Sequence, residues 1–415
     1  MAAAAELARN GVPVTVFESA RVLGGRARRV ETDGMRLDNG LHILLGACRE
    51  TLRLIELVKD PGEPLGLLRL PLELTIHPGF RLRAARLPAP LHLLSALLRA
   101  RGLDSGDRMA AARFMAWAKF SRFRLAGDTT VSNLLTSKRQ PEAVSRFLWN
   151  PLCVSALNTP PSQASAQVFL NVLRDSLNGN RADSDLLLPT LDFSALFPER
   201  AARYVQAHGG SVRLGVTVDA VRHKDSGFEL SADGERFTHT ILAVSPHRAG
   251  ALVAHYTELA PILQMIDRFV YQPIYSVYLQ YARETRLPFR MGGLEAPYSQ
   301  WLFDRGQLCG HDGLIGVVIS ASGAHQRLAH DDLARAVHAE LADNFPGLGE
   351  PRWHQVIAEK RATFSCTPGL LRPDNITPVA RLYLAGDYTA SAYPATIESA
   401  VRSGVRAANL VLQNA

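Results

Sequence analysis

Two stretches at opposite ends of the chain constrain its fold more than any other part of the sequence. Near the N-terminus, residues 14–18 (VTVFE) read as a short strand that ends in Glu18, and Gly24-Gly25-Arg26 follows soon after. An acid at the tip of a strand is where a dinucleotide-binding fold holds a ribose hydroxyl pair. The glycines let backbone approach a pyrophosphate, and Arg26 or Arg28 supplies a fork of donors.

The C-terminal stretch has a complementary pattern. Residues 382–385 form a short apolar run that predicts a buried strand, Gly386 and Asp387 form a turn, and residues 395–412 predict a helix. A helix N-terminus that faces such a turn is suited to bind phosphate. Taken alone, this C-terminal stretch is better explained as an ordinary strand-loop-helix crossover. Together they predict one cofactor held by both ends of the chain.

Three longer strings carry a family resemblance: residues 37–43 (LDNGLHI), 150–160 (NPLCVSALNTP) and 386–404 (GDYTASAYPATIESAVRSG). With Glu18 and the glycine turn, they make the chain resemble the FAD-dependent amine oxidase and phytoene desaturase superfamily. Within it, the chain is most similar to the squalene-associated FAD-dependent desaturases, the hydroxysqualene dehydroxylases of hopanoid biosynthesis. The resemblance covers nearly the whole sequence.

This resemblance implies an α/β fold in two parts. A Rossmann-like FAD-binding domain is assembled from residues 1–46, 190–246 and 376–415, and a mixed sheet-plus-helices substrate-binding domain from residues 47–189 and 247–375. The implied cofactor is FAD. The residues expected to bind it are Glu18, Gly24, Gly25, Arg26, Gly40, Leu41, Val218, Gly386, Asp387, Ala395, Thr396 and Ile397.

The resemblance further implies a reaction in which hydroxysqualene loses its allylic hydroxyl and gains a hydride from reduced flavin, giving squalene. An apolar channel would exclude water, and the leaving hydroxyl needs a proton donor. His42 lies in the segment expected beside the flavin ring and is our candidate, with Tyr393 as a substitute. A hydrogen-bonded structural histidine is an equally compatible interpretation of His42.

The start of the chain departs from this pattern. A dinucleotide fold normally opens with a strand and a Gly-x-Gly-x-x-Gly turn, whereas residues 1–9 here already read as the first helix, closed by Asn10-Gly11. We therefore expect an N-terminal truncation, or a start assigned to an internal methionine. The first strand and its glycine turn would then be missing from the middle of the sheet. Such a chain is expected to fold poorly or to bind FAD weakly.

Other functions are compatible with the same motifs. A carotenoid or phytoene desaturase would use the same cofactor to remove hydride from a polyene. An amine oxidase fits less well, because the paired aromatic residues that flank an amine are not evident. A truncated chain without cofactor could instead act as a lipid-surface or partner-binding protein, which would bind liposomes without flavin or turnover.

The amino-acid composition limits the classes of partner that the protein is expected to bind. The net charge is +7, from 46 basic and 39 acidic residues, and no dense basic run points to nucleic acid. The four cysteines are far apart without metal spacing, which favours reduced thiols, no metal and a cytoplasmic location. No apolar run approaches the roughly 20 residues that span a bilayer. Residues 108–124 interleave aromatic and basic side chains, a pattern compatible with either peripheral contact at the inner face of the membrane or an ordinary helical cover.

Local patterns predict further elements. Helices are expected at 50–58, 90–98, 141–149, 165–177 and 198–206, and a helix at 331–345. Strands are expected at 70–77, 211–222, 274–281, 314–320 and 353–357, with a hairpin turn at Asp233-Gly234. Small and apolar residues at 131–177 are expected to line a pocket for a hydrophobic isoprenoid substrate.

Overall fold

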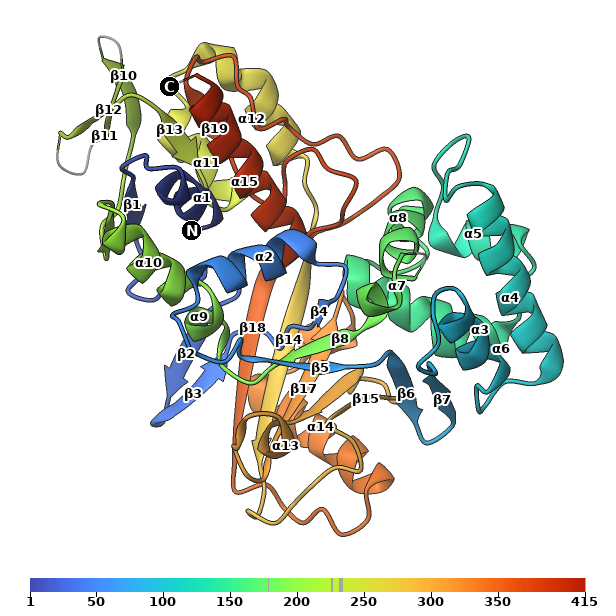
Figure 1. Ribbon diagram of the computed structural model, residues 1–415. Coiled ribbons are helices and arrows are strands. Elements are labelled where there is room, and N and C mark those ends of the chain that lie inside the picture. The colour runs from blue at the N-terminus through green and yellow to red at the C-terminus, as the bar shows by residue number, and fades with distance from the viewer. Residues whose placement is uncertain (178, 225–226, 231–233, 415) are drawn as a thin grey trace.

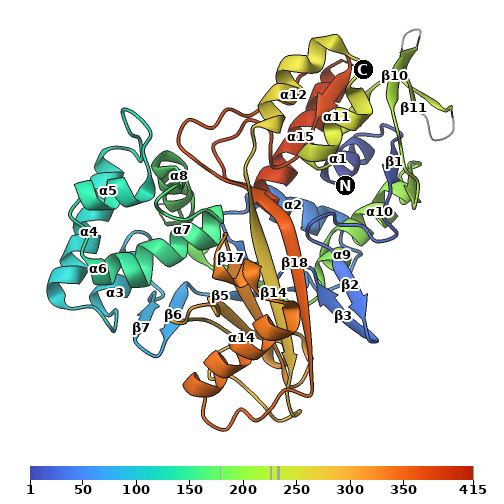
Figure 2. The ribbon, with the colours of Figure 1, turned by 180° about the vertical axis from the view of Figure 1, so that it is seen from behind.

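The computed structural model describes residues 1–177, 179–224, 227–230 and 234–414. It confirms the α/β class: a long central sheet is flanked by a group of helices on one side and by a layered strand-and-helix region beyond its end (Figure 1). Figure 2 shows the same arrangement from behind, with both chain ends in the strand-and-helix region.

The two chain ends pack together in that region. Helix α1 (Ala2–Arg9) lies against helix α15 (Ile397–Gln413), and Leu7, Ala407 and Val411 share one apolar cluster with strand β19 (Leu382–Leu384). Asn10 ends α1 as predicted, with a hydrogen bond to the last turn.

Two parallel strand pairs bring distant segments together. Strand β1 (Thr15–Glu18) pairs with β9 (Ser211–Leu214), and β13 (Thr240–Leu242) pairs with β19. Both pairs join sequence regions that were assigned to the cofactor domain, although the domain bounds themselves stay a prediction. Among the described residues no strand connects β1 to β19. Helices α2 (Arg49–Val58), α10 (Pro198–Ala207), α11 (Pro246–Val253) and α12 (Ala260–Asp267) surround these pairs.

The central sheet has seven strands in the order β18-β14-β17-β16-β15-β6-β7. Their bounds are β18 Trp353–Phe364, β14 Tyr271–Gln280, β17 Leu314–Ser320, β16 Trp301–Asp304, β15 Met291–Leu294, β6 Glu73–His77 and β7 Phe80–Arg83. Helix α14 (His330–Asn344) buries Leu333, Val337 and Leu341 against it. The period-two pattern of the sequence therefore corresponds to a sheet with one face covered by this helix.

The helical group beside the sheet comes from residues 91–177. Its members are α3 Leu91–Leu98, α4 Ser105–Phe120, α5 Val131–Ser137, α6 Glu142–Val144, the π-helical turn Ser145–Trp149, α7 Asn150–Leu157 and α8 Ala166–Leu177. Smaller elements complete the chain: β2 Arg29–Thr32, β3 Met35–Asp38, β4 Leu44–Leu45, β5 Leu67–Leu70, β8 Leu186–Pro189, α9 Phe193–Leu196, β10 Val221–Lys224, β11 Gly227–Leu230, β12 Arg236–Phe237 and α13 Arg305–Cys309.

Three predicted elements were wrong in detail. The strand expected at 211–222 is two strands, because Gly215 takes a positive φ of 69° and turns the chain between β9 and β10. The strand expected at 70–77 breaks at Pro71 into β5 and β6, which pair in different sheets. Strand β18 runs seven residues past the predicted end at 357, to Phe364.

The helix expected at 141–149 does not stop before Pro151. Its last turn widens into a π-helical turn, in which the Asn150 N–H bonds to the Ser145 carbonyl, and α7 then continues the axis. A wide turn just before a proline accommodates a residue that has no N–H to donate. Of the predicted hairpin turn, Asp233 lies outside the described residues, and Gly234 has a φ of 72°.

Candidate functional site

One cavity of about 1960 Å³ lies where the chain ends, the central sheet and the helical group meet. Glu18 and Asp387 both line it, so the two half-sites at opposite ends of the sequence face a common space. All the other predicted site residues line it too: Gly24, Gly25, Arg26, Gly40, Leu41, His42, Val218, Gly386, Tyr393, Ala395, Thr396 and Ile397. The structure therefore brings the complete predicted set together.

The glycine turn after β1 has the conformation that the sequence suggested. Gly24 and Gly25 have φ angles of 124° and 59°, in the region that side chains disfavour. A Cβ on Gly24 would lie 2.4 Å from the Ala27 carbonyl oxygen, whereas a Cβ on Gly25 would meet nothing within 4 Å. Gly24 is thus required by the turn itself, and Gly25 leaves open space at the cavity wall.

The Glu18 carboxylate accepts a hydrogen bond from the Ala20 N–H at 2.9 Å through its Oε1 atom. The Glu18 side chain lies on the cavity wall. An acid held this way at a strand tip presents an acceptor to a ribose hydroxyl pair.

Arg26 connects the two halves of the site directly. Its guanidinium donates to Asp387 Oδ1 at 2.5 Å and to the Ala362 carbonyl of β18 at 2.6 Å. Burial opposes its charge, but the Asp387 carboxylate outweighs burial and raises the Arg26 pKa. The Arg26 guanidinium, which was expected to face a pyrophosphate, is bound by protein groups in this structure. The Arg28 guanidinium donates to the Gly25 carbonyl at 3.5 Å.

The C-terminal turn is held by a buried polar network. The Ser403 hydroxyl accepts from the Gly386 N–H at 3.0 Å and shares a 2.7 Å hydrogen bond with Thr389. Asn375 donates to the Leu384 carbonyl and to Ser403. Thr396 caps α15 by accepting from the Ser399 N–H. Residues 396–398 at the start of this long helix line the cavity, where the N-terminus of a helix favours a phosphate group.

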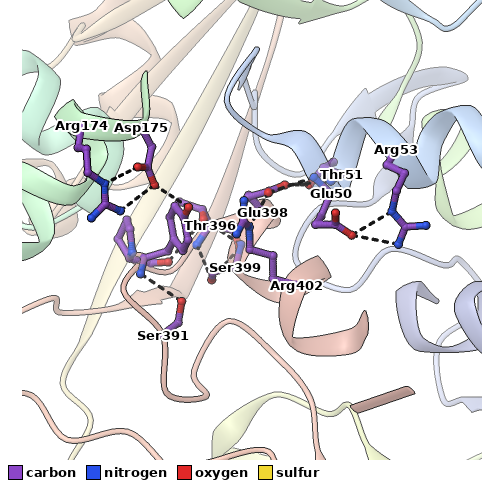
Figure 3. Close-up of polar contacts among 12 residues, drawn as sticks. Glu50, Thr51, Arg53, Arg174, Asp175, Ser391, Thr396, Glu398, Ser399 and Arg402 are labelled. Atoms are coloured by element: carbon purple, nitrogen blue, oxygen red, sulfur yellow. Dashed lines mark hydrogen bonds and ion pairs between the residues drawn. The ribbon is translucent and has the colours of Figure 1, made fainter. Parts of the chain in front are cut away.

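Glu398 has a role that sequence reasoning missed. Its buried carboxylate accepts from the Thr51 N–H at 2.9 Å and the Thr51 hydroxyl at 2.7 Å, and also from the Glu50 N–H at 3.2 Å. It thereby caps helix α2, whose own N-cap residue makes no side-chain bond (Figure 3). The Arg402 Nε also donates to the Glu398 carboxylate, at 2.7 Å. Only this last contact, at i+4 on one helix, had a signal in the sequence.

His42 presents a buried polar atom to the site. Its Nε2 has no hydrogen-bond partner among the described residues, and the edge of the ring meets Phe193 at a centroid distance of 4.9 Å. Burial lowers the His42 pKa to about 4, aided by the Arg26 charge and opposed by a hydrogen bond with the Arg26 backbone. The imidazole is therefore uncharged at neutral pH.

Tyr393 is held differently. Its hydroxyl donates to Asp175 Oδ2 at 2.6 Å, and Asp175 also pairs with Arg174 at 2.6 Å (Figure 3). The Arg402 guanidinium lies 4.7 Å from the Tyr393 ring centroid. Burial and the Asp175 carboxylate raise the Tyr393 pKa to about 12, so the hydroxyl keeps its proton at neutral pH. This contact ties α8 of the helical group to the entry of α15.

The far half of the cavity is apolar. Its lining comes from the helical group and from the sheet face that those helices cover. The apolar side chains include Leu93, Leu97, Met115, Leu148, Trp149, Leu152, Phe169, Val172, Leu173, Ile274, Met291, Trp301, Phe303 and Val318. A volume well above the roughly 300–1,000 Å³ of ordinary ligand sites can hold both a cofactor and a long hydrophobic molecule.

The polar half fits a flavin nucleotide. Glycines at positive φ, the α15 N-terminus and the Glu18 acceptor suit phosphate and ribose groups. His42 Nε2 and the Tyr388 hydroxyl are two buried polar atoms on this wall that have no partner within the described part of the chain. Both atoms are covered by neighbouring protein atoms, so the fit to a flavin nucleotide rests on the glycine turns, the α15 N-terminus and Glu18.

Within the described ranges, no group of three His, Cys, Asp or Glu side chains could hold a metal ion. Cys48, Cys153, Cys309 and Cys366 are all free thiols. No helix in the described part of the chain is long and apolar enough to cross a bilayer.

Comparisons with known proteins identify the family of the chain. The family described as flavin containing amine oxidoreductase matches residues 1–412. A hydroxysqualene dehydroxylase from Rhodopseudomonas palustris is 30% identical over 99% of this chain and 96% of that protein. A 15-cis-phytoene desaturase from Synechococcus elongatus is 24% identical over 98% and 92%.

The fold also matches solved structures. An oxidoreductase from Methanosarcina mazei superposes with a TM-score of 0.74 over 99% of this chain and 97% of that one, at 15% sequence identity. At this identity the likeness concerns the fold alone.

Proposed function

The chain belongs to the flavin containing amine oxidoreductase family, and on that premise we propose that it uses FAD to act on a long isoprenoid. It is a flavin-dependent oxidoreductase. The specific reaction that we propose is the reductive dehydroxylation of hydroxysqualene to squalene, as a step of hopanoid biosynthesis. The observation that carries the proposal is the large cavity, in which the predicted cofactor residues and a long apolar lining share one space.

The cofactor half would hold FAD in the following way. Glu18 would accept from the ribose, and the turns at 24–26 and 386–387 with the α15 N-terminus would lie along the pyrophosphate. The segments 40–42 and 395–397 would border the flavin ring. When bound, the flavin would supply the hydride that replaces the hydroxyl.

The protein's own groups must exclude water and supply a proton to the departing hydroxyl. Side chains of α3, α4, α7 and α8 form the dry wall that exclusion requires. His42 lines the cavity, its covered Nε2 has no hydrogen-bond partner among the described residues, and its ring is uncharged at neutral pH. We therefore propose that His42 orients the hydroxyl as a neutral imidazole. The Tyr393 hydroxyl, already donated to Asp175, is the second candidate donor.

A phytoene-type desaturase is the second candidate function. The same apolar cavity suits a polyene, and a 15-cis-phytoene desaturase is among the relatives. Such an enzyme would run the cofactor chemistry in the opposite direction, taking hydride from the hydrocarbon.

One experiment separates these functions. The purified protein is first examined for a flavin absorbance spectrum, then incubated anaerobically with hydroxysqualene and a chemical reductant, and in parallel with phytoene and an oxidant. Formation of squalene supports the dehydroxylase. Formation of new double bonds in phytoene without squalene would favour the desaturase, and bound flavin with neither product would reject both.

The location of the protein is also a proposal. We place it in the cytoplasm with peripheral contact at the inner face of the membrane, where a water-insoluble isoprenoid resides. The net charge of +7 supports contact with an anionic surface.

A further inference from the structure

Helix α3 (Leu91–Leu98) is apolar on two opposite faces. Leu93, Ala96 and Leu97 line the large cavity. Leu91, Leu94 and Leu98 are 52%, 45% and 59% exposed. At 3.6 residues per turn these two sets fall on roughly opposite sides of the helix. Helix α3 therefore lies between the cavity on one side and the outside of the molecule on the other.

The outer face of α3 has no polar side chain to present to water. Its two polar residues are turned away: His92 is fully buried, and the Ser95 hydroxyl donates to the His92 carbonyl at 2.7 Å. Every exposed residue of the helix is a leucine. Leu87, just before the helix, is exposed as well. We call the side chains of Leu87, Leu91, Leu94 and Leu98 the leucine stripe. A contiguous exposed apolar stripe is characteristic of an interaction surface.

Positive charges flank the stripe. Arg86 precedes it, and Arg99 and Arg101 follow it, all three exposed. None of these arginines has an ion-pair partner among the residues that the structure describes. The two acids that follow the stripe, Asp104 and Asp107, are bonded to each other's backbone N–H groups in the capping box of α4. Leucines bordered by unpaired arginines match the acyl layer and the anionic headgroups of a lipid surface.

We propose that the leucine stripe docks on an anionic lipid bilayer and that the isoprenoid enters the cavity beside helix α3. The substrate class rests on the function proposed above, whereas the docking surface rests on the exposed leucines and arginines alone. The route follows from the position of α3: a molecule dissolved in the acyl layer outside α3 is separated from Leu93 and Leu97 by this helix only. An isoprenoid that takes this route never has to enter water.

Vesicle sedimentation tests the docking surface. The probes are vesicles of phosphatidylcholine alone and of equal parts phosphatidylcholine and phosphatidylglycerol. The test variant is the triple substitution Leu91→Ser, Leu94→Ser and Leu98→Ser, and the matched control is Val270→Ser, Leu371→Ser and Ile376→Ser, three exposed apolar residues elsewhere. We expect the test variant to lower the partition coefficient on mixed vesicles about tenfold or more. The control should bind like the unchanged protein.

Charge variants test the headgroup contribution. Arg86→Gln with Arg99→Gln should weaken binding to the mixed vesicles by about fivefold per arginine, and should leave binding to phosphatidylcholine unchanged. Equal loss on both kinds of vesicle would contradict an electrostatic role for these arginines.

Measurements of turnover distinguish two negative outcomes: that the leucine stripe does not dock on lipid, and that the protein does not act on hydroxysqualene. Squalene formation is measured with hydroxysqualene dissolved either in the mixed vesicles or in detergent micelles. The leucine-stripe variant should lose at least about tenfold of its rate in vesicles and keep its rate in micelles. If neither protein turns over hydroxysqualene but vesicle binding still depends on the stripe, the function fails and the docking surface stands.

Two results would overturn the docking proposal. One is unchanged vesicle binding by the test variant while the unchanged protein turns over substrate. The other is a concentration-dependent dimer in light scattering that the Leu-to-Ser changes abolish without any effect on vesicle binding. The stripe would then be an interface between two copies of the chain.

Discussion

The guanidinium of Arg26 lies 2.5 Å from the carboxylate of Asp387, which is 361 residues later in the chain. Asp387 is almost fully buried, and the Arg26 side chain is 30% exposed. The pair joins the glycine turn after β1 to the turn after β19, so it holds the two predicted half-sites at one cavity wall.

Breaking this pair should destabilise the protein. We expect Arg26→Met to lower the free energy of unfolding by about 2 kcal/mol, because it leaves the buried Asp387 carboxylate without its partner. The cost is smaller than for a fully buried pair, because the Arg26 side chain is partly exposed to solvent. Asp387→Asn should cost a similar amount, and the double variant less than the sum. Urea unfolding at fixed pH measures all three.

A matched control for that cycle is Arg36→Met. Arg36 is 68% exposed and lies 3.4 Å from an exposed Glu31, so its removal should change the free energy of unfolding by less than about 0.5 kcal/mol. Additive effects of Arg26→Met and Asp387→Asn would show that the two side chains do not interact in solution.

Glu398 is expected to act as a clamp between helices α15 and α2. Glu398→Ala removes the acceptor for two backbone N–H groups and the Thr51 hydroxyl in a buried place, and should cost about 3 kcal/mol. Glu398→Gln keeps one acceptor oxygen and should cost about half as much. Thermal and urea unfolding measure both changes. Glu56→Gln, on the exposed side of α2, is the control and should be neutral; equal stability of all three variants would reject the clamp.

Local signals in the sequence were sufficient for most elements. The apolar run at 382–385, the glycine turn at 24–26 and the period-two pattern of β14 and β17 each depend on neighbouring residues, and the structure has them where they were expected. The convergence of Glu18 and Asp387 on one cavity was also predicted, because each chain end carries half of a dinucleotide-binding pattern.

Contacts between distant segments were not predictable in the same way. Nothing near Glu398 in sequence indicates that it caps α2, and nothing near Arg26 indicates that Asp387 will hold its guanidinium. Pro151 signals a helix end, yet a π-helical turn before it lets the helix continue. These features depend on tertiary packing, which overrides local preference.

Asp38 should make stability depend on pH. Burial raises the Asp38 pKa from 3.8 to about 6, against the opposing charge of Arg305 and a hydrogen bond from the Phe193 N–H. The folded state therefore holds this proton more tightly than the unfolded state. The resulting stability is fully present below about pH 4 and is lost as the pH rises through 6, by up to about 3 kcal/mol.

The variant Asp38→Asn isolates that contribution. Asparagine can still accept the hydrogen bond from the Phe193 N–H, but it does not titrate. As the pH rises from 4 to 7, the unchanged protein should therefore lose stability relative to the variant. Urea unfolding at several pH values gives this difference. A difference that stays constant with pH would show that Asp38 titrates near its ordinary pKa.

The two side chains proposed to act on the substrate hydroxyl, His42 and Tyr393, predict different variant kinetics. If His42 contacts the substrate hydroxyl through Nε2, His42→Asn should lower kcat by about 100-fold or more with the flavin spectrum unchanged. Because its pKa is about 4, the rate should show no acidic limb near pH 6.5 in the unchanged protein. The exposed His208 offers the control substitution His208→Asn, which should leave the rate unaltered.

Tyr393→Phe provides the competing test. The Tyr393 hydroxyl is donated to Asp175, so its loss removes one hydrogen bond to a carboxylate that Arg174 still neutralises, and should cost about 1–2 kcal/mol of stability. If Tyr393 only positions α8 against α15, kcat should fall less than tenfold and the pH profile should keep its shape. If instead Tyr393→Phe abolishes turnover and His42→Asn does not, the proton comes from the tyrosine, and the imidazole has a structural role. Rate measurements with both variants on hydroxysqualene in micelles decide between the two side chains, because micelles remove any effect of membrane docking on substrate supply.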